Sequence, residues 1–193
     1  MKTLDDVYAY WFETPNDLKK WFYDGEQYDA QIRTDFESLY EKVISADCAA
    51  VVETLSTKHV LCTIILLDQF GRHMYRGSSK AFSADSIALQ YALTLLRRGK
   101  VDALNSFEQL FALMPLQHSE SIEHKDILLE FIQNKLETCS EPDMTVYKSM
   151  LLHTRGHRHV LTLFGRYPTR NTALRRASTP AEELYLTEGG VPK

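Results

Sequence analysis

The sequence predicts an all-α protein, and two observations lead to this prediction. Apolar residues recur at three- and four-residue steps along nearly the whole chain, which is the period of an amphipathic helix. No pair of alternating apolar and polar runs is joined by a hairpin turn, which disfavours a β-sheet. Helices of about 10–20 residues with short connections fit antiparallel pairs. We therefore expect a single helical domain over residues 1–187, followed by a loose tail at 188–193.

The first half of the chain contains four helical patterns before residue 71. A short helix is expected at 3–12 and another at 47–55. Between them, one amphipathic face is formed by Tyr28, Ile32, Phe36, Leu39, Tyr40 and Val43. Residues 58–70 are apolar on all sides, so this helix should be central in the fold.

The remaining helices have recognisable ends. Ser83 is expected to cap the next helix, which should end at Arg97 and Arg98 before Gly99. Pro115 is expected to break the helix that precedes it. The later helices are predicted at 105–113, 120–138, 143–164 and 179–187.

Composition restricts the class of protein. The 193 residues are 44% hydrophobic and 25% charged, with a net charge of −4, so the chain as a whole has no bias toward nucleic acid or anionic membranes. Three cysteines without metal spacing are typical of reduced thiols in an intracellular protein. The longest apolar run, 60–67, is far shorter than the roughly 20 residues that span a bilayer. We expect a cytoplasmic protein without a membrane partner.

The segment “IILLDQFGRHMYRG”, residues 64–77, ends an apolar run in polar and charged side chains. Asp68, Arg72 and Arg76 fall at i, i+4 and i+8, on one face of a helix, with Gln69 and His73 beside them. Two interpretations stay open. Either an Asp–Arg pair closes the end of a buried helix, because a buried carboxylate needs such a partner, or these polar side chains line a site.

Histidines and carboxylates gather in two places without a metal signature. His118, Glu120, Glu123 and His124 follow Pro115, but acidic residues also favour helix N-termini. In the 143–164 helix, His153 and His157 sit in an apolar stripe, and the glutamate of an “HExxH” motif is missing. Core histidines that are satisfied by neighbouring groups are the simpler interpretation. The sequence predicts no metal site and identifies no cofactor.

Residues 155–176 hold six arginines, no lysine and no acidic residue. The planar fork of arginine suits carboxylate and phosphate. On an acidic chain these arginines must meet carboxylates from elsewhere or an anionic ligand. The six are Arg155, Arg158, Arg166, Arg170, Arg175 and Arg176.

Several segments together resemble one known family. They are “YWF” at 10–12, “WFYDGEQYDAQIRTDF” at 21–36, “LLDQFGRHMYRG” at 66–77, “AFSAD” at 81–85, “FEQLFALMPLQHSE” at 107–120, “HRHVLTLFGRYPTRN” at 157–171 and “STPAEE” at 178–183. In these motifs the chain resembles domain-of-unknown-function family 924, an uncharacterised and mainly bacterial group. The resemblance implies a tetratricopeptide-like α-α superhelix of antiparallel helix pairs, and it implies no particular reaction.

The chain departs from the family pattern at five positions. The family usually has Pro where this chain has Gly71, Asn where it has His73, Phe where it has Tyr167, and His where it has Thr169. A glycine that commonly precedes the last motif arginine is Arg175 here.

Polar motif residues on a helical scaffold suggest a shared concave surface, because segments that are distant in sequence can line one face of stacked helix pairs. The residues that we expect there are Asp68, Gln69, Arg72, Arg76, His118, Glu120, His157, Arg166, Arg170 and Asn171.

The sequence favours a helical-repeat-like domain that binds an anionic small molecule or an acidic peptide end in an Arg- and His-lined pocket. A metal-assisted or acid–base hydrolase is an alternative, with His118, Glu120 and His157 as working groups. A protein-interaction scaffold is a further alternative. RNA binding through 155–176 is disfavoured, because the net charge is negative and few lysines accompany the arginines. The sequence indicates no oligomeric state.

Overall fold

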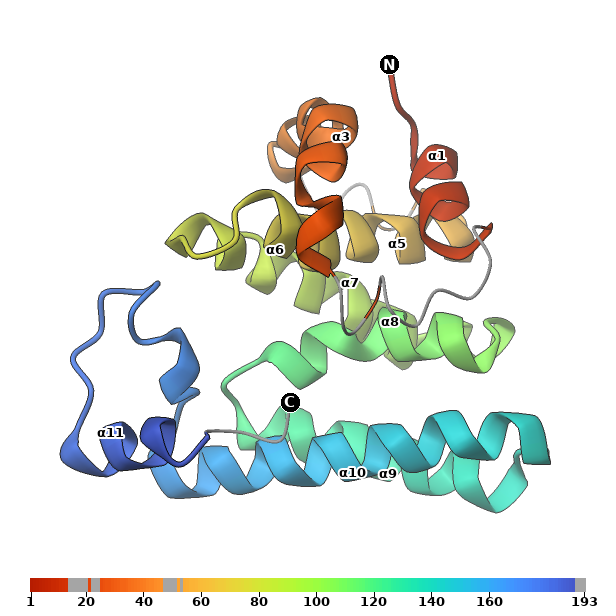
Figure 1. The fold of residues 1–193 in the computed structure, drawn as a ribbon. Coiled ribbons are helices and arrows are strands. Elements are labelled where there is room, and N and C mark those ends of the chain that lie inside the picture. The colour runs from red at the N-terminus through yellow and green to blue at the C-terminus, as the bar shows by residue number, and fades with distance from the viewer. Residues whose placement is uncertain (14–20, 22–24, 47–51, 53, 190–193) are drawn as a thin grey trace. The chain divides into compact units, whose positions relative to one another are not determined.

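The computed structural model describes residues 1–13, 21, 25–46, 52 and 54–189, and all elements in these ranges are helices (Figure 1). This confirms the predicted all-α class. The chain divides into two compact units, residues 1–115 and 116–193, which we call unit 1 and unit 2 and describe separately. The single domain and the tetratricopeptide-like stacking stay predictions. No helix in the described part of the chain is long and apolar enough to cross a membrane.

The elements of unit 1 follow the predicted order. They are α1 (Leu4–Tyr8), η1 (Ala9–Glu13), η2 (Gly25–Tyr28), α3 (Asp29–Ile44), α5 (Thr57–Ile64), η3 (Ile65–Phe70), α6 (Gly71–Met74), η4 (Ser79–Phe82), α7 (Asp85–Arg97) and η5 (Lys100–Ala103). α3 buries Ile32, Phe36 and Tyr40, as its periodicity predicts. The helix expected at 47–55 falls largely on residues outside the described ranges.

The central segment of unit 1 is 57–74, where α5, η3 and α6 follow one another without a break. Every residue from Val60 to Asp68 is buried, which confirms the helix predicted from the all-round apolar pattern. η3 is a π-helical turn, in which the Gly71 N–H bonds to the carbonyl of Leu66, five residues earlier. The proline that is usual in the family at position 71 has no N–H to make this bond.

The start of α7 differs from the prediction. Its N-cap residue is Ala84, which makes no side-chain cap. The hydroxyl of Ser83 instead donates to the Lys80 carbonyl of the preceding turn, at 2.8 Å. The prediction that Ser83 caps this helix was therefore wrong, because Ser83 lies one residue before the N-cap and has the helical backbone conformation of the turn that ends η4.

Pro115 lies inside α8 (Ser106–His118), so the prediction that it ends this helix was wrong. Proline removes one backbone N–H and disfavours the helical conformation of the residue before it. The last turn is nevertheless held by side chains from later elements, which bond to the carbonyls of Leu116, Gln117 and His118. These tertiary contacts outweigh the local cost of the proline.

Unit 2 is built on an antiparallel helix hairpin. Its elements after α8 are α9 (Ile122–Thr138), α10 (Glu141–Phe164), η6 (Pro168–Arg170) and α11 (Pro180–Thr187). α9 and α10 lie side by side in Figure 1 and agree with the helices predicted at 120–138 and 143–164 to within two residues at each boundary. At the end of α10, Val160 and Leu161 pack with Tyr167, and Tyr185 of α11 covers them.

The segment after η6 closes in a Schellman-type turn. The Arg176 N–H donates to the Asn171 carbonyl at 2.8 Å, and the Arg175 N–H donates to the Thr172 carbonyl at 3.2 Å. Arg175 has a φ of 54°, and it is the only non-glycine residue with a positive φ in the described ranges. Glycine adopts this conformation without a Cβ clash, which explains the glycine that is common here in the family.

Arg175→Gly should therefore stabilise the protein. The left-handed conformation costs an L-residue roughly 1–2 kcal/mol, and the greater freedom of unfolded glycine offsets about 0.5–1 kcal/mol of the gain. We expect a net increase of about 0.5–1 kcal/mol in the free energy of unfolding, measured by urea denaturation. Arg175→Ala keeps the Cβ and should give no such gain. A less stable glycine variant would contradict the strain argument.

Candidate functional site

Asp68 is fully buried at the end of the central segment. Its Oδ1 lies 3.4 Å from Nη1 of Arg72, which also donates to the Asp68 backbone carbonyl at 3.0 Å. Nε2 of Gln69 donates to the other carboxylate oxygen. The structure thus confirms the Asp68–Arg72 pair that the i, i+4 spacing predicted.

A second carboxylate meets Arg72 from α7. The two Nη atoms of Arg72 donate to Oδ1 and Oδ2 of Asp85, at 2.9 and 3.0 Å. Burial opposes the guanidinium charge, but the carboxylates of Asp68 and Asp85 outweigh this effect and raise the pKa of Arg72. This network ties α7 to the central segment.

Arg76 and His73 share a third carboxylate, Asp29, at the start of α3. Arg76 donates to both oxygens of Asp29 at 2.6 and 2.8 Å, and Nδ1 of His73 lies 2.7 Å from Oδ1. Burial lowers the pKa of His73 and outweighs the opposing effect of Asp29. A neutral imidazole therefore donates its Nδ1 proton to Asp29 and holds α3 against α6.

A different set of polar contacts closes the C-terminal end of α8 in unit 2. Nζ of Lys125 donates to the carbonyls of Leu116 and Ser119, and the Tyr167 hydroxyl donates to the Gln117 carbonyl at 2.9 Å. Arg170 donates to the His118 carbonyl at 2.7 Å. The last carbonyls of a helix have no partner within it, and here side chains from α9, η6 and the residue before η6 supply the partners.

We call this group the α8-end cluster. It contains the residues Gln117, His118, Glu120, Lys125, His157, Tyr167, Arg170 and Arg176.

Lys125 is the most unusual member of the cluster, since its side chain is 0% exposed. Burial, followed by the nearby charge of Arg170, lowers the pKa of Lys125 to about 7. Sequence reasoning missed this residue. A signal was present, because Lys125, Leu128 and Ile132 share the inward face of α9 at helical spacing.

His157 faces the same helix end. Its Nδ1 contacts Nε2 of Gln117, and its ring meets that of Tyr167 edge-on at 5.3 Å. Burial, and then the charges of His118 and Lys125, lower the pKa of His157 to about 3, so its ring is neutral at physiological pH. Oε1 of Gln117 is buried and makes no hydrogen bond within the described part of the chain.

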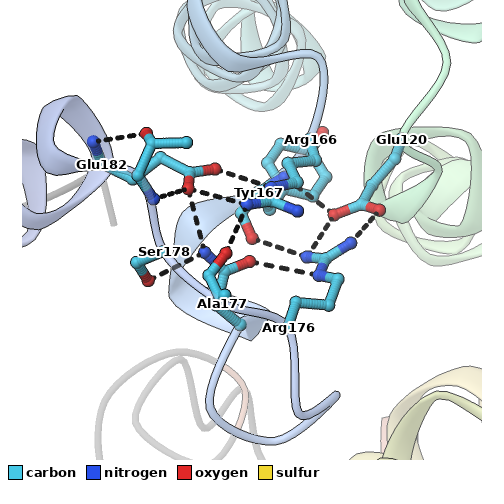
Figure 2. Close-up of polar contacts among 9 residues, drawn as sticks. Glu120, Arg166, Tyr167, Arg176, Ala177, Ser178 and Glu182 are labelled. Carbon is cyan, nitrogen blue, oxygen red and sulfur yellow. Dashed lines mark hydrogen bonds and ion pairs between the residues drawn. The ribbon is translucent and has the colours of Figure 1, made fainter.

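Glu120 joins the cluster to the loop after η6 (Figure 2). Its two oxygens accept from Arg176 at 2.7 and 2.9 Å, and Oε1 also accepts from the Tyr167 backbone N–H at 2.7 Å. Burial raises the pKa of Glu120, but the hydrogen bonds from Arg176 and Tyr167 outweigh it and lower the pKa. The carboxylate is thus held in its ionised form.

Figure 2 also shows how Glu182 of α11 fixes this loop. Arg166 donates to both carboxylate oxygens at 2.6 and 2.7 Å and to the Ala177 carbonyl at 2.8 Å. Asn171 reaches Glu182 and the Ser178 hydroxyl. The hydrogen bonds from Arg166 and Thr179 lower the pKa of Glu182 to about 2.

The family model described as a bacterial protein of unknown function, DUF924, matches residues 7–190. The chain belongs to this family. Among solved structures, it is similar to a protein of unknown function, ATU0120, from Agrobacterium tumefaciens, at 26% identity and a TM-score of 0.79. That similarity covers 96% of this chain and 97% of the other. A search of the curated proteins found no match.

In this DUF924 protein the predicted site residues fall into two groups. Asp68 contacts Gln69 and Arg72 in unit 1, whereas Arg76 of the same unit pairs with Asp29. The group in unit 2 contains His118, Glu120, His157, Arg166, Arg170 and Asn171. That both groups line one surface stays a prediction. No cluster of three or more metal-ligating side chains occurs among the residues that the structure describes.

Proposed function

We propose that the α8-end cluster of this DUF924 protein binds a small anion, as a carboxylate or phosphate group of a metabolite or of a peptide end. The observation that carries the proposal is the gathering of basic groups: Lys125, Arg170 and Arg176 all lie at the C-terminal end of α8, around the carboxylate of Glu120. Guanidinium and ammonium groups give an anion charge-assisted hydrogen bonds. An anion bound there also favours the charged form of Lys125.

The residues take different roles in this proposal. His118 and Arg170 are half-buried, and in this proposal they contact the ligand. His157 and Gln117 are neutral groups beside the charge, and the buried Oε1 of Gln117 is an acceptor for a ligand N–H or O–H.

Arg166 and Asn171 support the site indirectly. Both bind Glu182, so they hold the loop that carries Arg176. A small metabolite or peptide end also suits the cytoplasmic location that the sequence predicts.

The hydrolase alternative has less support from the geometry. A general acid or base works best with a pKa near the operating pH. The pKa of His157 is lowered to about 3, and Glu120 is held ionised by Arg176. Both groups are thus suited to fixing charge and shape rather than to moving protons at neutral pH.

Phosphate and citrate should raise the melting temperature of the wild type more than that of Arg170→Gln. A ligand at about 100 times its dissociation constant adds roughly 2.7 kcal/mol of stability, and removing the guanidinium removes part of that gain. The measurement is the anion-induced shift of each protein relative to its own value in chloride, because Arg170→Gln also removes the bond to His118.

Arg175→Gln is the matched control, since Arg175 is an exposed arginine of the same acid-free segment. Anions also stabilise proteins by general exclusion from their surfaces, and the control reports that effect. Equal anion-induced shifts in all three proteins would contradict the proposed anion site.

A further inference from the structure

The outer faces of α9 and α10 carry opposite charges. The exposed charged residues of α9 are all acidic, namely Glu123, Asp126, Glu130 and Glu137. α10 contains no Asp or Glu after residue 143, and the exposed basic residues of this part are Lys148, Arg155 and His159. Two exposed leucines share the outer stripe of α10, Leu152 at 70% and Leu163 at 56% exposure.

Both stripes face away from the core of the hairpin. On α9 the acidic residues lie opposite the buried residues Lys125, Leu128 and Ile132, as a period of 3.6 requires. The pair between Arg158 and Asp126, with Nε and Oδ1 2.6 Å apart, bridges the two helices. This pair shows that the acidic and basic stripes flank a common surface of the hairpin.

We propose that this surface is a homodimer interface in which α9 of each copy packs on α10 of the other. A two-fold axis parallel to the helices exchanges α9 and α10, so each acidic stripe meets a basic one in an antiparallel four-helix arrangement. A two-fold axis across the hairpin places α9 on α9, where like charges repel. The charge pattern thus selects one of the two symmetric arrangements.

The same symmetry fixes which residues meet. Rotation about an axis parallel to the helices leaves the level of each residue along the hairpin unchanged, so the Arg158–Asp126 pair sets the register. One turn from it, Arg155 faces Glu130 of the second copy, and further along Lys148 faces Glu137. In the other direction, Leu163 reaches the level of Ile122, which is 38% exposed.

In this register the exposed apolar residues of the two copies meet, as the charged residues do. Leu163 and Ile122 are both large hydrophobic side chains at the surface of one copy, and the arrangement buries each against the other copy. The proposal is independent of anion binding, because it uses the outer face of the hairpin and not the α8-end cluster.

Sedimentation velocity of the full chain tests the interface. We expect a dimer at low salt that dissociates toward monomer at about 1 M NaCl, where the Debye length falls to about 3 Å. Arg155→Glu and Glu130→Arg should each weaken the dimer by about tenfold or more, because each change places like charges face to face twice in the dimer. The double variant should restore dimerisation.

Lys100→Glu makes the same charge change at an exposed position of unit 1 and should leave the dimer intact. Circular dichroism establishes that each variant is folded. A wild type that is monomeric at submillimolar concentration overturns the proposal. So does a dimer that is indifferent to Arg155→Glu, or a double variant that dissociates as readily as the single variants.

Discussion

Between pH 7 and pH 9, the wild-type protein should gain about 2 kcal/mol of stability relative to Lys125→Met. The folded state holds the pKa of Lys125 at about 7, below the ordinary value of 10.5 that applies to the unfolded chain. In this window the unfolded state therefore binds the proton more strongly than the folded state does. Stability must rise with pH wherever the unfolded state carries more protons, by at most about 1.4 kcal/mol per pH unit for one group.

Methionine is the informative replacement because it keeps the volume of the lysine stem and removes the titrating amine. Urea unfolding of both proteins at pH 7, 8 and 9 gives the difference directly, and subtraction cancels every other titrating group. Lys100→Met makes the same substitution at an exposed position of unit 1 and is the matched control. A difference between wild type and Lys125→Met that is flat or falls with rising pH would refute the argument.

The same titration bears on the proposed function. An anion near Arg170 would favour the charged form of Lys125, so anion binding near pH 7 should be accompanied by proton uptake. The buried amine is therefore expected to act as a reporter of the ligand as well as a cap for α8.

Local sequence carries enough information to predict the helices. The inward face of α3 and the ends of α9 and α10 follow from the 3.6-residue period, which depends only on neighbours a few positions away. Pro115 shows where such reasoning fails, because the turn beyond it is held by Tyr167 and Arg170 from about 50 residues further along the chain.

In the candidate site, too, contacts between residues close in sequence were predictable and contacts between distant residues were not. The Asp68–Arg72 pair was predictable because its members are four residues apart on one helix. Asp29 and Asp85 were not, since nothing near them in sequence marks them as partners of Arg76 and Arg72.

The Arg-rich segment was visible from composition, but its acidic partners were not. Arg158, Arg166 and Arg176 each pair with a carboxylate from outside the segment. This agrees with the expectation that the arginines meet carboxylates from elsewhere in the chain. Only the folded chain identifies those carboxylates as Asp126, Glu182 and Glu120.

Asp68→Asn should lower the free energy of unfolding by about 2–4 kcal/mol. Breaking a fully buried pair costs about 3–5 kcal/mol, because the remaining charge is left without compensation. Here Asp85 still neutralises Arg72, which reduces the loss. Both oxygens of Asp68 face donors, so the new amide nitrogen must also oppose Arg72 or Gln69. Urea unfolding measures the cost.

Asp126→Asn makes the same chemical change in a pair with Arg158 whose carboxylate is 52% exposed. Water screens that pair, so no measurable loss of stability is expected. Equal losses in the two variants would show that burial of Asp68 contributes nothing.

The phosphate-induced shift in melting temperature then separates structure from function at Asp68. If the 68–76 segment takes part in anion binding, Asp68→Asn must change this shift as well as the stability, because loss of the carboxylate alters the electrostatic energy of an anion near Arg72. If the segment only joins α3 and α7 to the central helix, the shift must stay at the wild-type value while stability falls. The contacts of Asp68, Arg72 and Asp85 require the loss of stability in either case, and the anion response decides whether the site extends to them.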